Sequence, residues 1–324
     1  MKKENLRIIF MGTPEFAVPT LQALVENDYN VVAVVTQPDK PVGRHQTEMQ
    51  PSEVKKYALE HNLPVLQPVK MKDPEFVEQL RSYQANLQVV VAFRMLPEVV
   101  WDMPAYGTFN VHAALLPQYR GAAPINWAVI HGETQTGVTT FFLDHDIDTG
   151  RIIMQKPFAI PDTADVEYVY DGLMNLGAEI CLETLEKIIA ADGHPESIPQ
   201  EQMIPVGSEL HAAPKIFKET CEINWTKSAK QVYDFVRGLS PYPGAWTTLV
   251  APDGKETVLK IYKTRKTGKQ GQGSGTLCVD GKTLCVSAAD QLLELVEVQL
   301  AGKKRMAARD FLNGMKQIED YRVK

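Results

Sequence analysis

The sequence predicts an α/β domain with a doubly wound, mostly parallel sheet, followed by a smaller β-barrel domain. In the first half, short β-branched and apolar runs alternate with segments of helical periodicity, which is typical of a parallel sheet covered by helices. Residues 192–208 are rich in Pro, Gly and polar residues and have no sustained periodicity, which is typical of a linker. After them come short strand-like runs separated by Gly and Pro.

The strands of the first domain are predicted from near-continuous apolar runs, because strands of a parallel sheet are buried on both faces. The pattern is that of a Rossmann-like sheet. Helices are predicted at 16–26, at 51–61 and from about 164 to 190. The predicted strands are 6–10, 30–36, 87–93, 108–112, 137–143 and 151–157. We therefore predict a catalytic domain at 1–191, a linker at 192–208 and a second domain at 209–324.

The second domain is predicted to open with a helix at 228–239 and to continue with five short strands. Many short strands in about a hundred residues favour a small barrel, and we expect an OB-fold-like one. The run GKQGQGSG at 268–275 is predicted to be a flexible loop. The predicted strands are 245–250, 258–264, 276–279, 283–287 and 292–299.

Charge is unevenly distributed along the chain, whose net charge is -6. Residues 209–324 contain 19 Lys and Arg against 13 Asp and Glu, whereas residues 1–208 contain 15 against 27. A basic second domain indicates a polyanionic partner.

The remaining bulk features indicate a cytoplasmic protein without a membrane partner. No apolar stretch approaches the roughly 20 residues that span a bilayer, and the first residues lack the pattern of a signal peptide. The cysteines are expected to pack rather than react, because they are scattered without CxxC spacing. They are Cys181, Cys221, Cys278 and Cys285.

Three polar residues follow or end predicted strands, where ligands bind in an open parallel sheet. Asn110 and His112 are two residues apart on the strand TFNVH, so their side chains share one face. Asp148 lies in the loop DHDIDTG after another strand. An Asn can donate to a developing oxyanion, a His can act as general acid, and an Asp can hold the His and accept an amine proton. These residue types suffice for acyl transfer to an amine without a metal, but they are not diagnostic.

Other interpretations of the same motifs are weaker. A single Asn or His at a strand end is more often a hydrogen-bonded turn or core residue than a catalyst. DHDIDTG also resembles a calcium loop, but Thr149 stands where Gly is needed and Gln155 where Glu is needed. His131 and His145 have no partners at metal-ligand spacing. We therefore expect no metal. The turn MGTPEF from Met11 lacks GxGxxG, so a nicotinamide cofactor is not expected either.

The segment Phe109 to Gly150 resembles the folate-dependent formyltransferases, with their Asn-x-His, LLPxYRG and Asp-x-Gly motifs. The resemblance implies a formyltransferase domain that uses 10-formyltetrahydrofolate, and catalytic roles for Asn110, His112 and Asp148. It extends over nearly the whole chain for the branch that formylates initiator methionyl-tRNA in translation initiation. Further matching segments are LRIIFMGTPEFAVPTLQAL, TQPDKPVGR, PSEVKKYA, INWTKSAKQVYDFVRGLSPYPGAW and LAGKKRMAARDFL.

The resemblance also implies binding residues and a monomer. The loop with Lys40 and Arg44 is expected to contact tRNA, because both side chains suit phosphates and base edges. The second domain is expected to bind tRNA as well. The residues expected beside the folate are Arg94, Met95, Ala114, Leu115, Leu116 and Pro117.

The chain departs from the family pattern at three places. Ala114 stands where the family commonly has Ser, which removes a hydroxyl from the folate side. Asp146 replaces a usual Gly and adds a negative charge close to Asp148. The stretch Phe93-Arg94-Met95 replaces an Ala-Tyr-Gly type of sequence, so the pterin pocket is expected to differ in detail.

Two other functions stay open on the sequence alone. Related sugar formyltransferases carry out the same chemistry on an amino sugar, although the PDKPVGR loop and the basic second domain favour tRNA. A non-catalytic RNA-binding protein is the other, although the presence of Asn110, His112 and Asp148 together argues against it.

Overall fold

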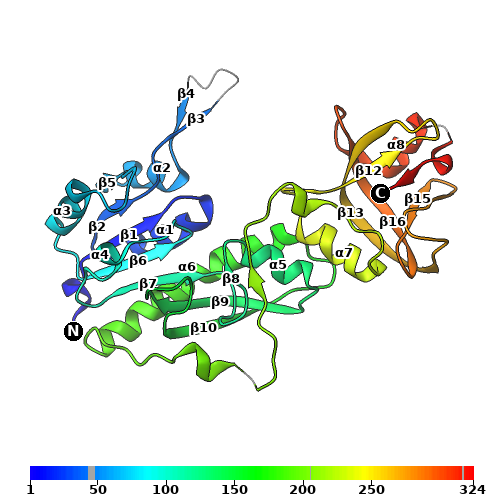
Figure 1. Ribbon diagram of the computed structural model, residues 1–324. Helices are drawn as coiled ribbons and strands as arrows, with labels where there is room; N and C mark the ends of the chain where they lie inside the picture. Colours follow the sequence, from blue (N-terminus) through cyan, green and yellow to red (C-terminus); the bar gives the residue numbers. More distant parts are fainter. Residues whose placement is uncertain (43–47, 205, 316) are drawn as a thin grey trace. The chain divides into compact units, whose positions relative to one another are not determined.

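The computed structural model describes residues 1–42, 48–204, 206–315 and 317–324. The chain forms two compact units, each of them discontinuous in sequence (Figure 1). The first contains residues 1–121, 135–159 and 170–212, and the second contains 122–134, 160–169 and 213–324. The domain boundaries at 191 and 209 stay a prediction. Two short segments of the N-terminal half, 122–134 and 160–169, belong to the second unit, which sequence periodicity did not indicate.

A seven-stranded sheet forms the centre of the first unit, in the order β10-β9-β7-β6-β1-β2-β5. Neighbouring strands from β5 to β7 are parallel, whereas β9 pairs antiparallel with both β7 and β10, so the mostly parallel sheet is confirmed. All residues of β1 and β6 are buried, as their continuous apolar runs predict. The bounds are β1 Ile8–Gly12, β2 Val31–Val35, β5 Val65–Leu66, β6 Leu87–Val91, β7 Thr108–His112, β9 Gln135–Phe142 and β10 Ile152–Ala159.

Helices and one hairpin complete the first unit. Ser52 caps α2 by accepting from Lys55 N, and Asp73 caps α3 with Pro74 at its first position. Strands β3 Lys40–Val42 and β4 Glu48–Gln50 pair in a hairpin that projects from the unit (Figure 1). The α-helices are α1 Val18–Glu26, α2 Glu53–Glu60, α3 Pro74–Ser82, α4 Glu98–Trp101 and α6 Val166–Ala190, the last continuing from the second unit. The 3-10 helices are η1 Lys3–Asn5, η2 Glu15–Ala17 and η3 Gln200–Met203.

Part of the segment predicted as a linker is bound to the first unit. Ile198 forms a two-way backbone bridge with Ile152, with both N···O distances 2.8 Å. Met203 packs on a small apolar cluster of Leu116, Phe141 and Ile152. This part of the chain therefore lies along the edge of the sheet, although its Pro, Gly and polar composition is typical of a linker. Composition did not indicate this, because backbone hydrogen bonds do not depend on side-chain periodicity.

The second unit is built on a curled antiparallel sheet in the order β14-β15-β16-β13-β12-β18, with β17 paired to β16. The sheet curls into a half-barrel, and an isolated bridge links Thr276, just before edge strand β14, to Arg322 of edge strand β18. Strand β13 continues to Gln270, so the loop predicted at 268–275 was partly wrong. Its first residues, 268–270, belong to β13, which pairs with β16 as far as Gln270. The bounds are β12 Ala245–Val250, β13 Glu256–Gln270, β14 Leu277–Asp280, β15 Thr283–Ser287, β16 Gln291–Leu300, β17 Met306–Ala307 and β18 Arg322–Val323.

Helices α5 Pro124–Ile130, α7 Ala229–Gly238 and α8 Ala308–Gly314 belong to the second unit, with η4 Glu219–Cys221 and η5 Ile318–Asp320. Helices α5 and α7 approach closely, because a Cβ on Gly238 would lie 2.8 Å from Ile130 N. The unit has its own core, which includes Trp225, Leu259 and Phe311. Short strands β8 Arg120–Gly121 and β11 Ala212–Ala213 lie where the chain passes between the units.

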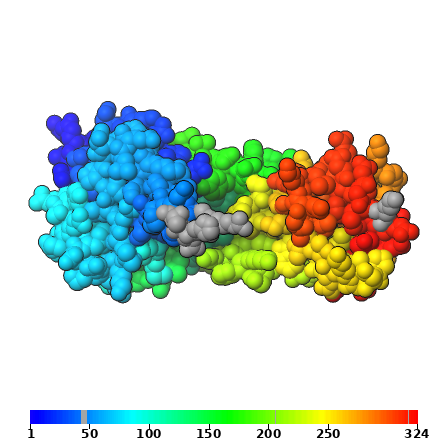
Figure 2. All heavy atoms as spheres, turned by 90° about the horizontal axis from the view of Figure 1, so that it is seen from above, coloured from blue at the N-terminus to red at the C-terminus, as the bar shows by residue number. Residues whose placement is uncertain are grey.

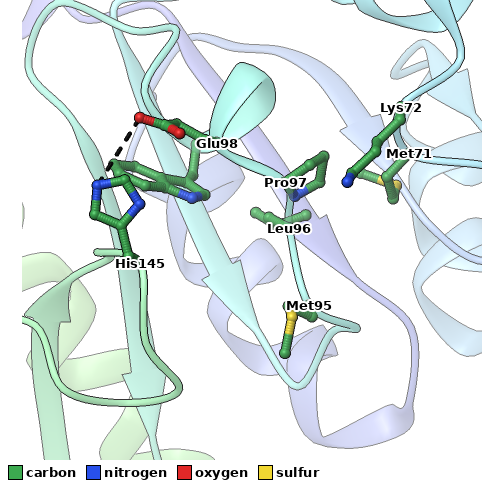
Figure 3. A pocket seen from close by; sticks show the side chains of 8 residues that line it. Met71, Lys72, Met95, Leu96, Pro97, Glu98 and His145 are labelled. Atoms are coloured by element: carbon green, nitrogen blue, oxygen red, sulfur yellow. Dashed lines mark ion pairs between the residues drawn. The ribbon is translucent and has the colours of Figure 1, made fainter.

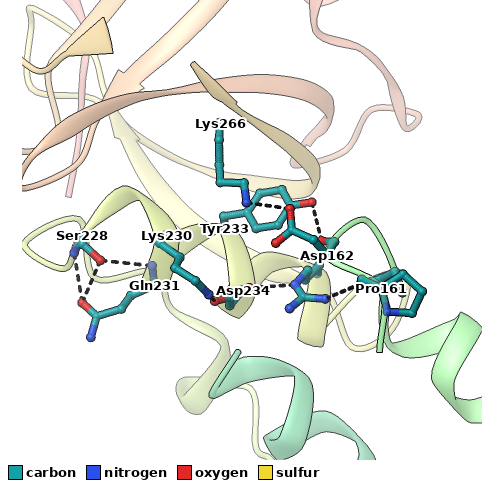
Figure 4. Close-up of polar contacts among 10 residues, drawn as sticks. Pro161, Asp162, Ser228, Lys230, Gln231, Tyr233, Asp234 and Lys266 are labelled. Carbon is teal, nitrogen blue, oxygen red and sulfur yellow. Dashed lines mark hydrogen bonds and ion pairs between the residues drawn. The ribbon is translucent and has the colours of Figure 1, made fainter. Parts of the chain in front are cut away.

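A buried polar network ties helix α7 to the segment before α6 (Figure 4). Arg237 donates from Nε to Asp234 Oδ1 at 2.8 Å and from Nη1 to the carbonyls of Ala164 and Pro161. Tyr233 Oη donates to the carbonyl of Asp162 at 2.9 Å. A hydrogen bond from Lys266 lowers the pKa of Asp162. All of these residues lie within the second unit.

No helix in the described part of the chain is long and apolar enough to cross a membrane. The four cysteines are free. Burial raises the pKa of the Cys181 thiol, and burial raises that of Cys285 to about 11. Since the thiolate is the reactive form, this agrees with the expectation that Cys181 and Cys285 pack rather than react.

Candidate active site

Strand β7 places Asn110 and His112 on one face at the carboxyl end of the sheet. Its neighbours are parallel β6, where Val90 lies opposite Asn110, and antiparallel β9, where Thr139 lies opposite His112. The spacing of two residues puts both side chains on the same side of the sheet, as expected for a strand. His112 is 6% exposed, so its ring is fixed by packing.

The hydrogen bonds of His112 define which ring nitrogen carries a proton. Nε2 lies 3.0 Å from the carbonyl oxygen of Tyr119. Because a carbonyl only accepts, Nε2 must be the donor. The other nitrogen, Nδ1, is therefore the one that gains or loses a proton, and it faces Asp148 Oδ2 at 3.9 Å. This distance is longer than a direct hydrogen bond, so the imidazole and the carboxylate lie close together without being bonded to each other.

Asn110 has a buried amide oxygen, Oδ1, without a hydrogen-bond partner among the described residues. A buried polar atom left unpaired costs free energy, so such atoms are rare and often face a ligand group. The amide brings one acceptor and two donors to the space beside His112. It is equipped to bind a group that both donates and accepts, such as an amine adding to a carbonyl.

The loop 143–150 holds Asp148 in a left-handed backbone conformation, with φ +57°. Only Gly, Asn and Asp adopt it with ease. Asp144 Oδ1 organises the loop by accepting from Asp146 N and from Thr149 Oγ1. Asp148 Oδ2 accepts from Gly121 N at 2.9 Å. The carboxylate, 13% exposed, thereby lies close to the His112 ring.

Gly150 closes the loop at a point where no side chain fits. A Cβ there would lie 1.6 Å from the carbonyl oxygen of Phe142. The Asp-x-Gly spacing is therefore a geometric requirement, because Gly150 lets the loop return against β9 while Asp148 stays at the edge of the sheet.

The segment Ala114–Pro117, predicted beside the folate, is pinned to the sheet by two side chains. Thr139 Oγ1 donates to Ala114 O at 2.6 Å and accepts from Leu116 N at 3.0 Å. Gln155 Nε2 donates to Leu116 O at 2.7 Å. These backbone groups are already bonded, and the side chains of Ala114 and Leu116 are buried. Pro117 is buried as well, so Leu115 is the side chain of this segment that is available to a ligand.

In the second segment predicted to lie beside the folate, Arg94 and Met95 have different environments. Arg94 is half-buried: its guanidinium donates to the carbonyls of Pro68 and Val69, and burial lowers its pKa. Met95, 71% exposed, lines a cavity of about 430 Å³ (Figure 3). The volume is in the range of small-molecule sites. The cavity is lined by Met71, Lys72, Met95, Leu96, Pro97, Glu98, Trp101 and His145.

Lys40, predicted to contact tRNA, is exposed on the hairpin β3–β4. Arg44 lies outside the described residues. Figure 2 shows the blue hairpin segment at the surface of its unit. The base of the hairpin is held by Asp39, which accepts from Lys55 Nζ and from Gln67 Nε2, both at 2.7 Å. The bond from Lys55, followed by that from Gln67, lowers the pKa of Asp39.

The structure brings Asn110, His112 and Asp148 together, but the sequence did not identify the residues that orient them. Gly121 is part of the YRG motif, which could have indicated a backbone donor. Thr139 and Gln155 carry no motif, and only their hydrogen bonds to the Ala114–Pro117 segment reveal them. Among the described residues, no group of three His, Cys, Asp or Glu is placed to hold a metal ion.

Two family descriptions match successive parts of the chain. Residues 6–185 match the family described as formyl transferase, and residues 215–316 match the formyl transferase C-terminal domain. The chain is 58% identical over 325 residues to the methionyl-tRNA formyltransferase of Parabacteroides distasonis, which covers 100% of both chains.

Solved structures show the same fold at low identity. An N-formyltransferase from Helicobacter canadensis, in complex with folinic acid and dTDP-3-aminofucose, has a TM-score of 0.62 and 18% identity over 93% of this chain and 100% of that one. HypX from Aquifex aeolicus, in complex with tetrahydrofolic acid, has a TM-score of 0.59 and 18% identity over 95% of this chain and 47% of its own.

Proposed function

The chain belongs to the formyltransferase family, and from this premise we propose that it transfers the formyl group of 10-formyltetrahydrofolate to the amino group of initiator methionyl-tRNA. The observation that carries the proposal is the joint placement of Asn110, His112 and Asp148, in a chain that matches a methionyl-tRNA formyltransferase over its full length. The product would be N-formylmethionyl-tRNA for translation initiation, made by a cytoplasmic monomer.

The reaction joins the amine nitrogen to the formyl carbon and breaks the bond from that carbon to N10 of the folate. We assign Asn110 and His112 to the oxygen of the formyl group, which becomes an oxyanion on attack. Asn110 donates from its amide. Protonated His112 donates from Nδ1, because Nε2 is committed to Tyr119 O.

Asp148 is assigned to the proton that the attacking amine loses. Its Oδ2 is bound by Gly121 N, which leaves Oδ1 to accept that proton. The 3.9 Å between His112 Nδ1 and Asp148 Oδ2 leaves both groups available to the reactants. The proton accepted by Asp148 is finally balanced by the proton that N10 takes when tetrahydrofolate leaves.

The folate is proposed to lie beside Ala114–Pro117 and the Arg94–Leu96 segment. The unpaired Asn110 Oδ1 fits a donor from the reactants, and the cavity that includes Met95 offers an apolar wall of Leu96 and Trp101. Lys72 and His145 line the same cavity and suit the carboxylates of a folate tail. Arg94 acts here by shaping the wall, since it is bonded to backbone carbonyls.

The tRNA is proposed to contact Lys40, Arg44 and the second unit. The basic balance of residues 209–324 and the curled β-sheet support an oligonucleotide-binding role, and we propose an OB-fold-like barrel for it.

Purified protein should formylate methionyl initiator tRNA with 10-formyltetrahydrofolate, and should leave uncharged tRNA and free methionine unmodified. The acceptor must supply both a free amine, which reacts beside Asp148, and a tRNA body, which binds the basic surfaces. Formation of formylmethionyl-tRNA measures it. Transfer to a dTDP-amino sugar in place of tRNA would contradict the acceptor and favour the amino-sugar function, since a solved N-formyltransferase of the same fold binds dTDP-3-aminofucose.

Replacing Lys40 and Arg44 together with Ala should weaken tRNA binding about 10-fold to 100-fold and lower the slope of log affinity against log salt by about 2. Each lost cation removes one phosphate contact, while the reacting groups stay in place. Filter binding at several salt concentrations measures both quantities. Arg81→Ala removes an exposed cation of helix α3 and is the control; an equal loss in both proteins would contradict a specific role of the hairpin.

A further inference from the structure

Gln200 is a fully buried polar residue in the segment that sequence composition predicts to be a linker. It opens η3, directly after the bridge between Ile198 and Ile152. A long amide at 0% exposure, in a stretch otherwise rich in exposed residues, must satisfy its donors and acceptor within the protein. Its partners are the loop of Asp148 and the Arg120-Gly121 segment.

The amide nitrogen of Gln200 binds the Asp148 loop at two points. Nε2 donates to the carbonyl of Asp148 and to the carbonyl of Gly150, each at 2.8 Å. Two carbonyls two residues apart are thereby turned toward one donor group. This fixes the peptide plane after Asp148 and the one after Gly150, and so constrains the loop in which Asp148 has a left-handed backbone, with φ +57°.

The amide oxygen of Gln200 binds the other side of the same site. Oε1 accepts from Arg120 Nε at 3.0 Å and from Nη2 at 2.7 Å, a fork on a single acceptor. Arg120 precedes Gly121, whose N–H donates to Asp148 Oδ2. The Gln200 side chain thus links Asp148, which carries the carboxylate, to Arg120, which precedes the backbone donor Gly121.

We propose that Gln200 is a positioning residue, which holds Asp148 against Gly121 N–H and aims its carboxylate at His112. The inference rests on the proposed function, because the role of Asp148 does. Gln200 is itself held in place, because the bridge at Ile198 and the packing of Met203 fix the chain on both sides of it. The segment is therefore part of the catalytic framework.

Two substitutions separate the roles of the Gln200 amide. Gln200→Ala removes all four hydrogen bonds. Gln200→Glu keeps an acceptor for Arg120 but removes both N–H donors to the Asp148 loop. Gln202→Ala alters an exposed side chain in the same 3-10 helix and is the control.

Both Gln200 variants are expected to show kcat reduced about 10²-fold, with KM for each substrate within about threefold, because a small displacement of a reacting group lowers rate more than binding. Gln202→Ala is expected to match the parent protein. Rates are taken per folded molecule, with the thermal midpoint measured alongside. Turnover of Gln200→Glu within twofold of the control overturns the proposal, and so does a loss that disappears when rates are taken per folded molecule.

A second readout does not depend on the reaction. Amide hydrogen exchange at Gly121 reports its bond to Asp148 Oδ2 and is expected to be about tenfold faster in both Gln200 variants than in Gln202→Ala. Unchanged protection overturns the positioning role. Absence of formyl transfer by the parent protein, with exchange at Gly121 altered as expected, overturns the proposed function alone.

Discussion

Replacing Asp148 with Asn should lower kcat for formyl transfer about 10³-fold, with little change in tRNA affinity. Asn has the same shape, tolerates the left-handed backbone at φ +57° and keeps an oxygen for Gly121 N–H. What it lacks is a group that accepts the amine proton. The loss therefore isolates proton transfer from loop geometry. Steady-state formylation with saturating folate and tRNA measures it, with tRNA binding measured separately.

A matched control lies two residues away. Asp146→Asn removes one negative charge from the same loop, at an exposed position, and should leave kcat within about threefold because exposed charges are screened. If Asp148→Asn retained a tenth or more of the parent rate, Asp148 would not be the proton acceptor. If Asp146→Asn were equally impaired, the charge of the loop would matter rather than the position of one carboxylate.

Much of the first unit was predictable because its strands are buried on both faces. β7 was predicted at 108–112 and occurs at Thr108–His112, since its apolar positions and the preceding Gly107 bound the run clearly. From that strand, the pairing of Asn110 and His112 follows directly. β1 was predicted at 6–10 but occurs at Ile8–Gly12. Leu6 and Arg7 resemble strand residues in sequence, but backbone pairing with the neighbouring chain begins at Ile8, whose N–H donates to Asn30 O.

Short elements and orienting contacts were not predictable in the same way. The hairpin β3–β4 is exposed and contains Pro41, so it lacks the alternation of a half-buried strand. Helix α3 was missed although Asp73 and Pro74 mark its start. Gln200 shows why residues outside the motifs could not be predicted to contact the site. Its burial follows from tertiary contacts, and the surrounding composition does not distinguish a segment bound to the sheet from a free linker.

Replacing Asp234 with Ala should lower the free energy of unfolding by about 3–5 kcal/mol, because it leaves Arg237 buried without its charged partner. Asp234 and Arg237 are 3% and 7% exposed, and Arg237 also donates to Ala164 O at 2.9 Å. Denaturant unfolding of the full chain, followed by circular dichroism, measures the change. The same network orders the segment before α6, so the variant should also unfold there first.

Two further variants decide whether the unpaired charge causes this loss. Lys230→Ala removes the other partner of Asp234, a side chain 60% exposed, and should cost less than about 1 kcal/mol. Asp234→Ala combined with Arg237→Met should recover part of the stability, because the buried cation is gone and an apolar side chain fills its place. A double variant no more stable than Asp234→Ala would mean that the unpaired cation costs no more than the carbonyl contacts of Arg237 contribute, because the double variant loses those contacts too.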